Sequence, residues 1–493
     1  MTPGAKTPVV VADGESLSID DVVAVARDHA PVRLDDCAPD RIRRGRLVVE
    51  RAIDRGDEIY GVTTGAGAHK RFRVQPGQSS QFEALMLASQ GTGHGPPMQP
   101  DLARAALLRL VNGFAKGVSG VRVELVDRLL EALNTAAPLE ARTLGSIGIA
   151  DLIPLGELAG NALRDMPLAA KESMALIDNN SFSTAQAALA VHDCWRLLHA
   201  ADTAGALSLE AFRGNLSILH PAIAAVRPRP SLAVELEHFR ELLAGSELWD
   251  PGAARNLQDP LSFRTMVELH AALREALDYV ERQVVIELNA SQENPIVVAD
   301  EDRLVCVANF ECAAMAAALD LGRIALAPAL TSSCERTAKL LNSAFSGLTS
   351  GLSNDPDAPD EALSGLAVAS ASLTSEARLL AQPVSFDVAT SGIAEGIEDR
   401  ATMAPLAARR LQEMISLGEH IVATELVVAA QAIDLRRPER LGAGTQHAYD
   451  QVRSCVDFTD AGEPPPGNLE PLVHLIHAGQ FSILDGVVSA PTP

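Results

Sequence analysis

Aromatic residues are scarce in this sequence. They make up 3% of the 493 residues, with 12 Phe, 3 Tyr and 2 Trp, whereas hydrophobic residues as a whole make up 47%. Aromatic and β-branched side chains favour strands, while Ala and Leu favour helices. The shortage of aromatic residues therefore disfavours a fold based on sheets and predicts packed helices.

Basic residues are also too few to balance the acidic ones. Lys and Arg number 41 against 64 Asp and Glu, which gives a formal net charge of −23. Nucleic acids and anionic membrane surfaces attract proteins through clusters of basic side chains, so this balance argues against either partner. The acidic surface is expected to aid solubility.

Paired cysteines and long apolar runs are missing as well. The six cysteines are scattered without a C-x-x-C pair, which argues against a disulfide framework or a zinc site, and we expect no metal site. Cys306 and Cys312 stand in apolar stretches and are expected in the core. No run of about 18 apolar residues and no signal-peptide pattern is present, so we expect a cytoplasmic protein without a membrane span.

Helical periodicity is the main pattern that the sequence does contain. Beyond residue 200 the helical pattern extends over unusually long stretches compared with a mean helix of about 11–12 residues, which favours an all-α, long-helix bundle. We expect two domains, an N-terminal one over 1–200 that carries active-site loops and a bundle domain over 201–493. A short hairpin is expected within 290–308. The expected helices lie within 16–30, 41–56, 81–90, 101–117 and 121–136, and the long ones within 259–287, 309–343 and 402–435.

Three short segments could carry chemistry on residue type alone. Tyr60 opens a loop rich in Gly and Thr, which suits close backbone approach to a ligand but equally suits a buried tyrosine beside a turn. Arg264, one helical turn beyond Pro260, could bind a carboxylate or lie on the surface. Glu398, near Glu395 at a helix start, could be catalytic or could only complement the helix dipole.

Taken in order, six segments resemble the aromatic amino acid lyase family, which comprises histidine, phenylalanine and tyrosine ammonia-lyases and related aminomutases. The resemblance implies an all-helical homotetramer in which three chains build each active site. It also implies that Tyr60 is the base, that Arg264 holds the substrate carboxylate, and that Asn309, Phe310 and Glu398 belong to the site. The six segments are YGVTTGAG (60–67), VNGFAKGVSGVR (111–122), GSIGIADLIPL (145–155), QDPLSFR (258–264), NFECAAMA (309–316) and EGIEDRATMAPLAARR (395–410).

The same comparison exposes one missing element. Family lyases carry Ala-Ser-Gly before the Asp-Leu pair, and this tripeptide cyclises and loses water to form the electrophile methylideneimidazolone. Here only Ile149 and Ala150 stand between Gly148 and Asp151, with no serine and no glycine. The resemblance thus implies that the prosthetic group cannot form, and we expect no cofactor.

Further departures fall on the family's substrate pocket. Leu261 replaces the second tyrosine of the arginine segment, and Gln90 replaces the family's His or Leu selector. Asp178 stands where many family lyases have Asn. Arg400 stands where His usually follows the Glu-Asp pair. These replacements predict a substrate that differs from the usual aromatic amino acids.

The retained and lost groups together predict a substrate class. Without the electrophile, a primary ammonium is a poor leaving group, because any nearby base removes an N–H proton first. A quaternary ammonium has no such proton and leaves as a neutral amine. The family's ergothionase branch releases trimethylamine from a trimethylated histidine betaine in this way, without the prosthetic group. Asp178 would supply a negative charge that suits a fixed cation.

A cationic substrate would also help Tyr60. An unperturbed tyrosine has a pKa of about 10, so a nearby cation is needed to favour the phenolate. The sequence therefore predicts a lyase that eliminates an amine such as trimethylamine and forms an α,β-unsaturated acid. A different elimination, isomerisation or cyclisation on the same scaffold remains open, as does a catalytically inactive paralogue. Retention of Tyr60 and Arg264 weighs against the inactive protein.

Overall fold

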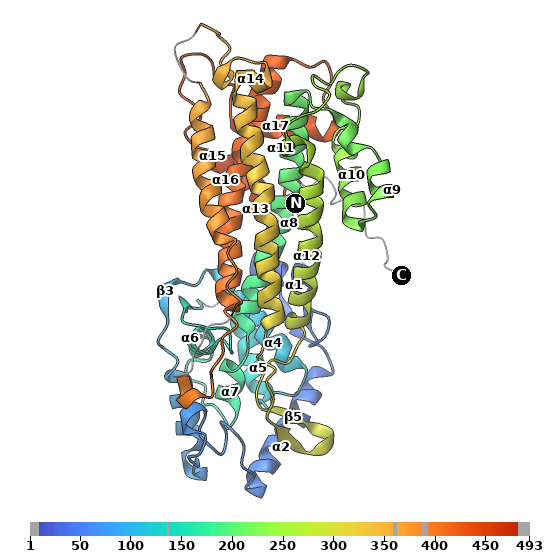
Figure 1. Cartoon of the computed structure of the whole chain (residues 1–493). Coiled ribbons are helices and arrows are strands. Elements are labelled where there is room, and N and C mark those ends of the chain that lie inside the picture. Colours follow the sequence, from blue (N-terminus) through green and yellow to red (C-terminus); the bar gives the residue numbers. More distant parts are fainter. Residues whose placement is uncertain (1–8, 136–137, 358–361, 387–392, 482–493) are drawn as a thin grey trace. The chain divides into compact units, whose positions relative to one another are not determined.

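The computed structural model describes residues 9–135, 138–357, 362–386 and 393–481, and it is mostly helical (Figure 1). The chain forms two compact units, each assembled from separate segments. Unit 1 comprises Met1–His192, Val280–Asp320 and Pro383–Arg409, and unit 2 comprises Asp193–Tyr279, Leu321–Gln382 and Arg410–Pro493. Four long helices contribute residues to both units: α8 (Ser181–Phe212), α12 (Met266–Leu288), α13 (Ala313–Leu341) and α16 (Ala404–Arg436).

Unit 1 combines short helices with three two-stranded sheets. The pair β1–β2 is parallel, while β3–β4 and β5–β6 are antiparallel. The hairpin β5–β6 confirms the one expected within 290–308. The helices are α1 (Ile19–Ala26), α2 (Ala38–Arg55), α3 (Ser79–Ala88), α4 (Pro100–Ala115), α5 (Val123–Asn134), α6 (Leu152–Leu163) and α7 (Glu172–Ile177), and the strands are β1 (Val10–Ala12), β2 (Val32–Leu34), β3 (His94–Pro97), β4 (Arg142–Leu144), β5 (Ile296–Val298) and β6 (Arg303–Val305).

Local signals set the ends of the first two helices. Ser18 caps α1 in a capping box with Asp21, whose carboxylate accepts the backbone N–H of Ser18. Helix α2 ends at Gly56, which has a φ of 77°, a conformation that glycine adopts without steric cost. Helix α2 thus ends directly before the Tyr60 loop, where the sequence predicted its end.

Unit 2 is a bundle of the remaining parts of the long helices with shorter helices at their ends (Figure 1). Gly205 of α8 lies against Met266 of α12, and Gly418 of α16 lies against Leu197 and Leu330, which are side chains of α8 and α13. These close approaches place the four helices in one bundle. The shorter helices are α9 (Ala222–Val226), α10 (Pro230–Leu242), α11 (Leu261–Arg264), α14 (Ser343–Ser346), α15 (Ser364–Leu380), α17 (Ala443–Cys455) and α18 (Glu470–His477).

Charged groups are buried inside the unit 2 bundle. Arg336 donates to both carboxylate oxygens of Glu425, at 2.5 and 2.8 Å, and neither side chain is exposed. His270 lies 2.6 Å from Asp202, also without exposure to solvent. Because buried charged or polar groups are costly unless paired, these contacts specify which helix faces meet.

Helix α13 is long and apolar enough, by length and composition alone, to span a bilayer. Within its most apolar stretch 56% is buried in the protein, as in the core helix of a soluble protein. The helix also carries Arg336, which is buried against Glu425. It is therefore a core helix of the bundle.

The expected long helices correspond to α12, α13 and α16, with ends shifted by one to seven residues. The sequence reasoning did not single out α8, whose 32 residues form another long helix. The expected domain limit at residue 200 falls inside α8, eight residues beyond His192, where this helix passes from unit 1 to unit 2.

Candidate active site

A pocket of about 500 Å³ in unit 1 brings together side chains that are far apart in the sequence. Its acidic groups are the phenol of Tyr60, the carboxyl groups of Asp178 and Glu398, and the thiol of Cys306. No Lys, Arg or His occurs among its lining residues in the described part of the chain. The lining residues are Tyr60, Ala66, Gly67, Met86, Gln90, Ile149, Leu152, Met174, Ile177, Asp178, Asn294, Cys306, Val307, Phe310, Ile397 and Glu398.

The loop after α2 holds Tyr60 at the pocket wall. Thr63 closes this loop, since its hydroxyl donates to the carbonyl of Asp57 and accepts the N–H of Ile59, both at 2.8 Å. Gly61 has a φ of 66°, and a side chain there would collide with Met174. The loop therefore requires glycine at this point to bring Tyr60 against the helix that carries Met174.

The hydroxyl of Tyr60 already has one partner in the loop. It accepts a hydrogen bond from the N–H of Gly67 at 2.8 Å. Burial raises the pKa of Tyr60 most, the Gly67 bond lowers it, and the charges of Asp178 and Glu398 raise it further. A cation bound in the pocket would oppose the effect of these carboxylates and favour the phenolate.

Asp178 lies at the C-terminal end of the short helix α7 and is 8% exposed. Burial raises its pKa to about 7, Lys171 opposes this increase, and Glu293 and Glu398 add to it. The backbone N–H of Asn294 also stabilises the carboxylate. Asp178 can thus change its charge near neutral pH, and a bound cation would favour the ionised form.

Glu398 lines the same pocket from the segment before α16, and it is half-buried. Burial raises the pKa of its carboxyl group. Two acidic groups with raised pKa values thus face one cavity. Such pairs are typical of sites that bind a cation or move a proton.

Ile149 and Ala150 lie where the family's prosthetic group would form. The side chain of Ile149 lines the pocket, and its backbone forms an isolated bridge with Glu311. Ala150 is buried and has a φ of 56°, in the left-handed region. An aliphatic side chain therefore occupies this part of the wall.

The backbone around these two residues is firmly hydrogen-bonded. The carbonyl of Gly148 accepts bonds from the Thr402 hydroxyl at 2.7 Å and from the Asn180 amide at 3.2 Å. The hydroxyl of Ser146 donates to Asp151 at 2.6 Å, so the nearest serine is held outside the two-residue gap. The residues present do not fit the chemistry of methylideneimidazolone, which needs a serine between two small residues.

The predicted site residues divide between the two units. Besides Tyr60, Asp178, Glu398 and Ile149, the pocket includes Gln90 and Phe310. Asn309 is exposed and is not among the lining residues, although it directly precedes Phe310. The pocket thus collects residues of four of the six sequence segments, together with residues outside them such as Gln90 and Asp178.

Arg264 and Leu261 belong to unit 2, on helix α11, whose buried Phe263 anchors it. The guanidinium of Arg264 donates to the side chain of Gln258. Leu261 is 60% exposed. These two residues lie outside unit 1 and stay predicted contributors to the site.

Several lining residues were not found by sequence reasoning. Cys306 was expected in the core, which is wrong: it is exposed and lines the pocket, because the hairpin β5–β6 ends just before it. Cys312 is buried as expected. Met174 and Ile177 lie on α7, and helical spacing could have indicated Met174, which precedes Asp178 by four residues.

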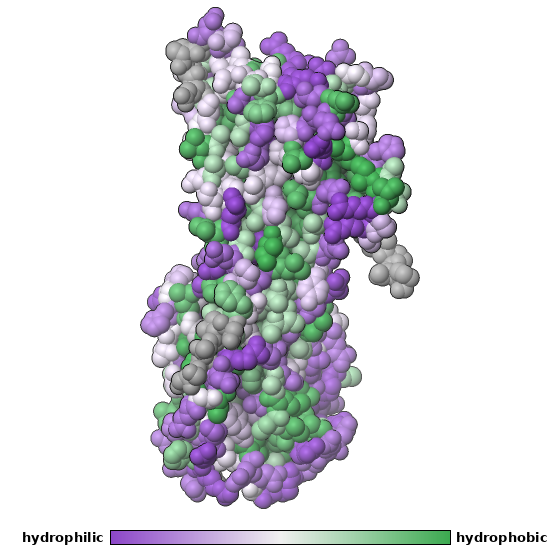
Figure 2. Space-filling view, in the orientation of Figure 1, coloured by the Kyte–Doolittle hydropathy of each residue, from purple (hydrophilic) through white to green (hydrophobic). Residues whose placement is uncertain are grey.

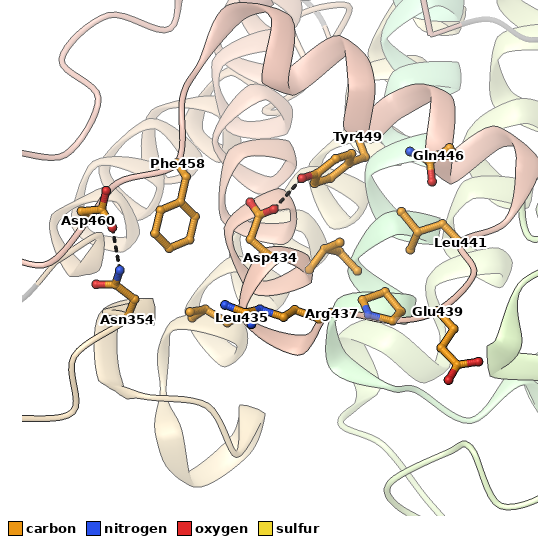
Figure 3. Close-up of a pocket in the computed structure, with 12 residues that line it drawn as sticks. Asn354, Asp434, Leu435, Arg437, Glu439, Leu441, Gln446, Tyr449, Phe458 and Asp460 are labelled. Carbon is orange, nitrogen blue, oxygen red and sulfur yellow. Dashed lines mark hydrogen bonds between the residues drawn. The ribbon is translucent and has the colours of Figure 1, made fainter.

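A second pocket, of about 550 Å³, lies in unit 2 around the end of α16 (Figure 3). Two of its three carboxylates are already engaged, since Asp434 accepts from Tyr449 at 2.5 Å and Asp460 accepts from Asn354 at 2.6 Å. It contains none of the predicted site residues. We therefore take the unit 1 pocket as the candidate site. Within the described residues, no group of three or more His, Cys, Asp or Glu side chains is arranged to hold a metal ion.

Comparisons with known proteins relate the chain to one family. The sequence profile described as "Aromatic amino acid lyase" matches residues 17–163 and 158–454. The chain is 35% identical over 483 residues to a histidine ammonia-lyase of Streptococcus pyogenes serotype M18, covering 92% of this chain and 93% of that protein. It is 34% identical to the histidine ammonia-lyase of Streptococcus sanguinis, with the same coverage.

Solved structures of related enzymes are also similar to the chain. The ergothioneine-degrading enzyme ergothionase from Treponema denticola, in complex with desmethyl-ergothioneine sulfonic acid, superposes with a TM-score of 0.90 at 27% identity. That alignment covers 96% of this chain and 99% of the other. Histidine ammonia-lyase from Trypanosoma cruzi superposes with a TM-score of 0.87 at 28% identity, covering 96% and 94%.

Proposed function

This chain belongs to the aromatic amino acid lyase family, and from that membership we propose a specific reaction for it. The family makes it a carbon–nitrogen lyase of amino-acid-like substrates. We propose that it works without methylideneimidazolone and eliminates a tertiary amine, such as trimethylamine, from a carboxylate-bearing substrate. The product would be an α,β-unsaturated acid.

The acidity of the unit 1 pocket is the observation that carries this proposal. Asp178 and Glu398 both line the pocket, and Asp178 is more than nine-tenths buried. No basic side chain accompanies them among the described lining residues. A buried acidic pocket of this kind favours a permanent cation, which a quaternary ammonium provides.

The aliphatic wall formed by Ile149 and Ala150 supports the proposal that the enzyme works without methylideneimidazolone. Ile149 and Ala150 fill the position of the cyclising tripeptide, and the carbonyl of Gly148 is held by Thr402 and Asn180. Neither residue can supply the hydroxyl that dehydration requires. A substrate whose amine needs no activation fits this wall, and a primary amine does not.

The proposed elimination needs only one proton acceptor. The Tyr60 phenolate takes the proton from the carbon β to the carboxylate, and the two electrons of that C–H bond form the new C=C bond. The C–N bond breaks, and the neutral tertiary amine leaves with its electron pair. The N–H of Gly67 is positioned to stabilise the phenolate, and the substrate's own cation lowers the pKa of Tyr60 before the proton moves.

We further propose that the active enzyme is a homotetramer and that Arg264 holds the substrate carboxylate. Figure 2 shows apolar residues on the surface over the long helices. In unit 2, Leu257, Val368 and Leu379 are 89, 73 and 65% exposed, which is unfavourable for an isolated chain. Association of copies would cover such residues and could bring Arg264 of one copy to the pocket of another. The cytoplasmic location stays a prediction.

A substrate panel tests the function directly. The purified protein would be incubated with trimethylated betaines of histidine, phenylalanine and tyrosine, and with the matching primary amino acids as controls. We expect release of trimethylamine and ultraviolet absorbance of the conjugated acid from at least one betaine, and no ammonia from the controls. Ammonia release from a primary amino acid would contradict the proposal, and an unreacted panel would favour another activity or an inactive paralogue.

Intact-mass measurement tests the prosthetic group separately. Because Ile149 and Ala150 cannot cyclise with loss of water, the mass should equal that of the unmodified chain. A deficit of two water molecules in a peptide spanning Gly145–Asp151 would refute this part of the proposal.

A further inference from the structure

Lys171 is a basic residue of unit 1 that lies outside the six segments that carry the family resemblance. It directly precedes α7, and its side chain is completely buried. Its ammonium lies 3.5 Å from a carboxylate oxygen of Glu293 and makes no hydrogen bond within the described residues. A buried ammonium without a hydrogen bond is costly, so its retention needs a reason.

The backbone of Lys171 is held in an unusual conformation by a buried acid. Its φ is 83°, in the left-handed region that side chains rarely adopt. Glu83 of α3 accepts the N–H of Lys171 at 2.9 Å and both the N–H and the hydroxyl of Ser173, at 2.7 and 2.5 Å. These three bonds fix the start of α7 and with it the direction in which the lysine chain leaves the backbone.

The position of Lys171 relates it to the pocket through two carboxylates. Asp178 ends the six-residue helix that Lys171 begins. Glu293 directly precedes Asn294, whose N–H bonds to Asp178, and Ser119 donates to the other oxygen of Glu293. The buried lysine thus contacts one buried acid, Glu293, and its charge also acts on a second, Asp178, which lines the pocket.

We propose that Lys171 is a positioning residue of the active site, whose buried charge favours the ionised form of Asp178 so that the pocket can bind a cation. This role rests on the proposed function, because the ionised Asp178 serves a cationic substrate. Glu293 competes with Asp178 for the same ammonium and limits its effect. The charged or titratable groups that act on Asp178 are Lys171 before α7, Glu293 before β5 and Glu398 before α16. The charge of Asp178 in turn raises the pKa of Tyr60, in the loop after α2.

The two partners of the ion pair should act in opposite directions. Replacing Lys171 by Met removes the positive charge and leaves Asp178 facing only acids, so its carboxyl should stay protonated to higher pH. Replacing Glu293 by Gln removes a negative charge and leaves the ammonium to Asp178 alone, so its carboxyl should ionise at lower pH. A merely structural role would not produce opposite shifts.

Difference infrared spectroscopy of the whole protein can measure this without any substrate. The carboxylic acid band of Asp178 would be identified by its loss in Asp178→Asn and followed over pH. We expect a midpoint of about 7 in the unmodified protein. We expect a rise of about one pH unit or more in Lys171→Met, a fall in Glu293→Gln and a value near the original in Lys171→Arg.

Binding of tetramethylammonium by calorimetry gives a second readout. At neutral pH, Lys171→Met should bind it about fivefold more weakly, since a rise of the midpoint from about 7 to about 8 lowers the ionised fraction of Asp178 from about one half to about one tenth. An unchanged midpoint in Lys171→Met, or shifts of the same sign in both variants, would overturn the proposal. If Lys171→Met does not fold, the midpoint of Asp178 in Glu293→Gln tests the proposal by itself. An unchanged or raised midpoint in Glu293→Gln would then overturn the proposal.

These results remain separable from the proposed reaction. Opposite shifts without trimethylamine release from any betaine would support the role of Lys171 and refute the function. Trimethylamine release with no shift in either variant would support the function and refute the role of Lys171.

Discussion

Replacing Tyr60 by Phe is the sharpest perturbation of the proposed mechanism, because it removes a single oxygen. That oxygen accepts one hydrogen bond, from the N–H of Gly67 at 2.8 Å. Losing one such bond in a half-buried loop should destabilise the protein by about 1 kcal/mol. Since domains are typically stable by about 5–15 kcal/mol, the variant should fold and keep its pocket.

The effect on turnover should be much larger than the effect on stability. A positioned general base contributes about 10²–10⁴-fold, which corresponds to about 3–5 kcal/mol of activation free energy. We expect Tyr60→Phe to lower trimethylamine release by this factor. Binding of tetramethylammonium should hardly change, because Asp178 and Glu398 remain in the pocket.

The pH dependence of turnover should show whether Tyr60 acts as the general base. Burial and two carboxylates raise the pKa of Tyr60 above its ordinary value in the empty pocket, so the phenol is mostly protonated at neutral pH. Below the lower pKa that Tyr60 has in the substrate complex, the amount of phenolate rises about tenfold per pH unit, and the turnover of saturated enzyme should rise with it. The residual turnover of Tyr60→Phe should lack this slope.

Tyr449→Phe provides a matched control. Its hydroxyl donates to Asp434 at 2.5 Å in unit 2, so the same chemical change removes a comparable hydrogen bond outside the candidate site. It should lower stability without lowering turnover. If Tyr60→Phe instead turns over a betaine at the rate of the unmodified protein, with the same slope, the base is another group and Glu398 is the next candidate.

Three further predictions concern binding, assembly and acid stability. Arg264→Ala should weaken binding of substrate and of unsaturated acids by about 1.5–3 kcal/mol, and equal affinity in calorimetry would exclude a carboxylate contact. Light scattering at micromolar concentration should give a tetramer, and a stable monomer would contradict the composite site. Burial lowers the pKa of His238 to about 4. The unfolded chain, with a histidine pKa of about 6.5, therefore binds a proton that the folded chain does not, and stability should fall by up to roughly 3 kcal/mol as pH drops from about 6.5 to 4. Over this pH range, the free energy of unfolding measured in urea should depend less on pH in His238→Phe than in the unmodified protein. An equal pH dependence would assign the proton to another group.

The sequence predicted those parts of the structure that depend on local pattern. Leucine spacing predicted α5, and the glycine at position 56 predicted the end of α2. The order of short segments predicted a pocket that includes Tyr60 and Phe310. Each of these features is set by residues that are close together in the chain.

The features that the sequence did not predict depend on contacts across the fold. Cys306 and Cys312 both stand in apolar stretches, yet only Cys312 is buried, because the end of β6 turns Cys306 toward the pocket. Lys171 would ordinarily be assigned to the surface. Its burial follows from Glu83, which lies 88 positions away and fixes its backbone, and no local pattern contains that information.

The discontinuous make-up of unit 1 has a consequence during synthesis. Tyr60 and Glu398 face one pocket, yet more than three hundred residues separate them in the chain. At about 5–20 residues per second, a ribosome adds Glu398 roughly 20–70 s after Tyr60. Until then Asp178 and Lys171 belong to a nascent chain that lacks one wall of its pocket, so a pause in translation between Asp320 and Pro383 should prolong dependence on chaperones.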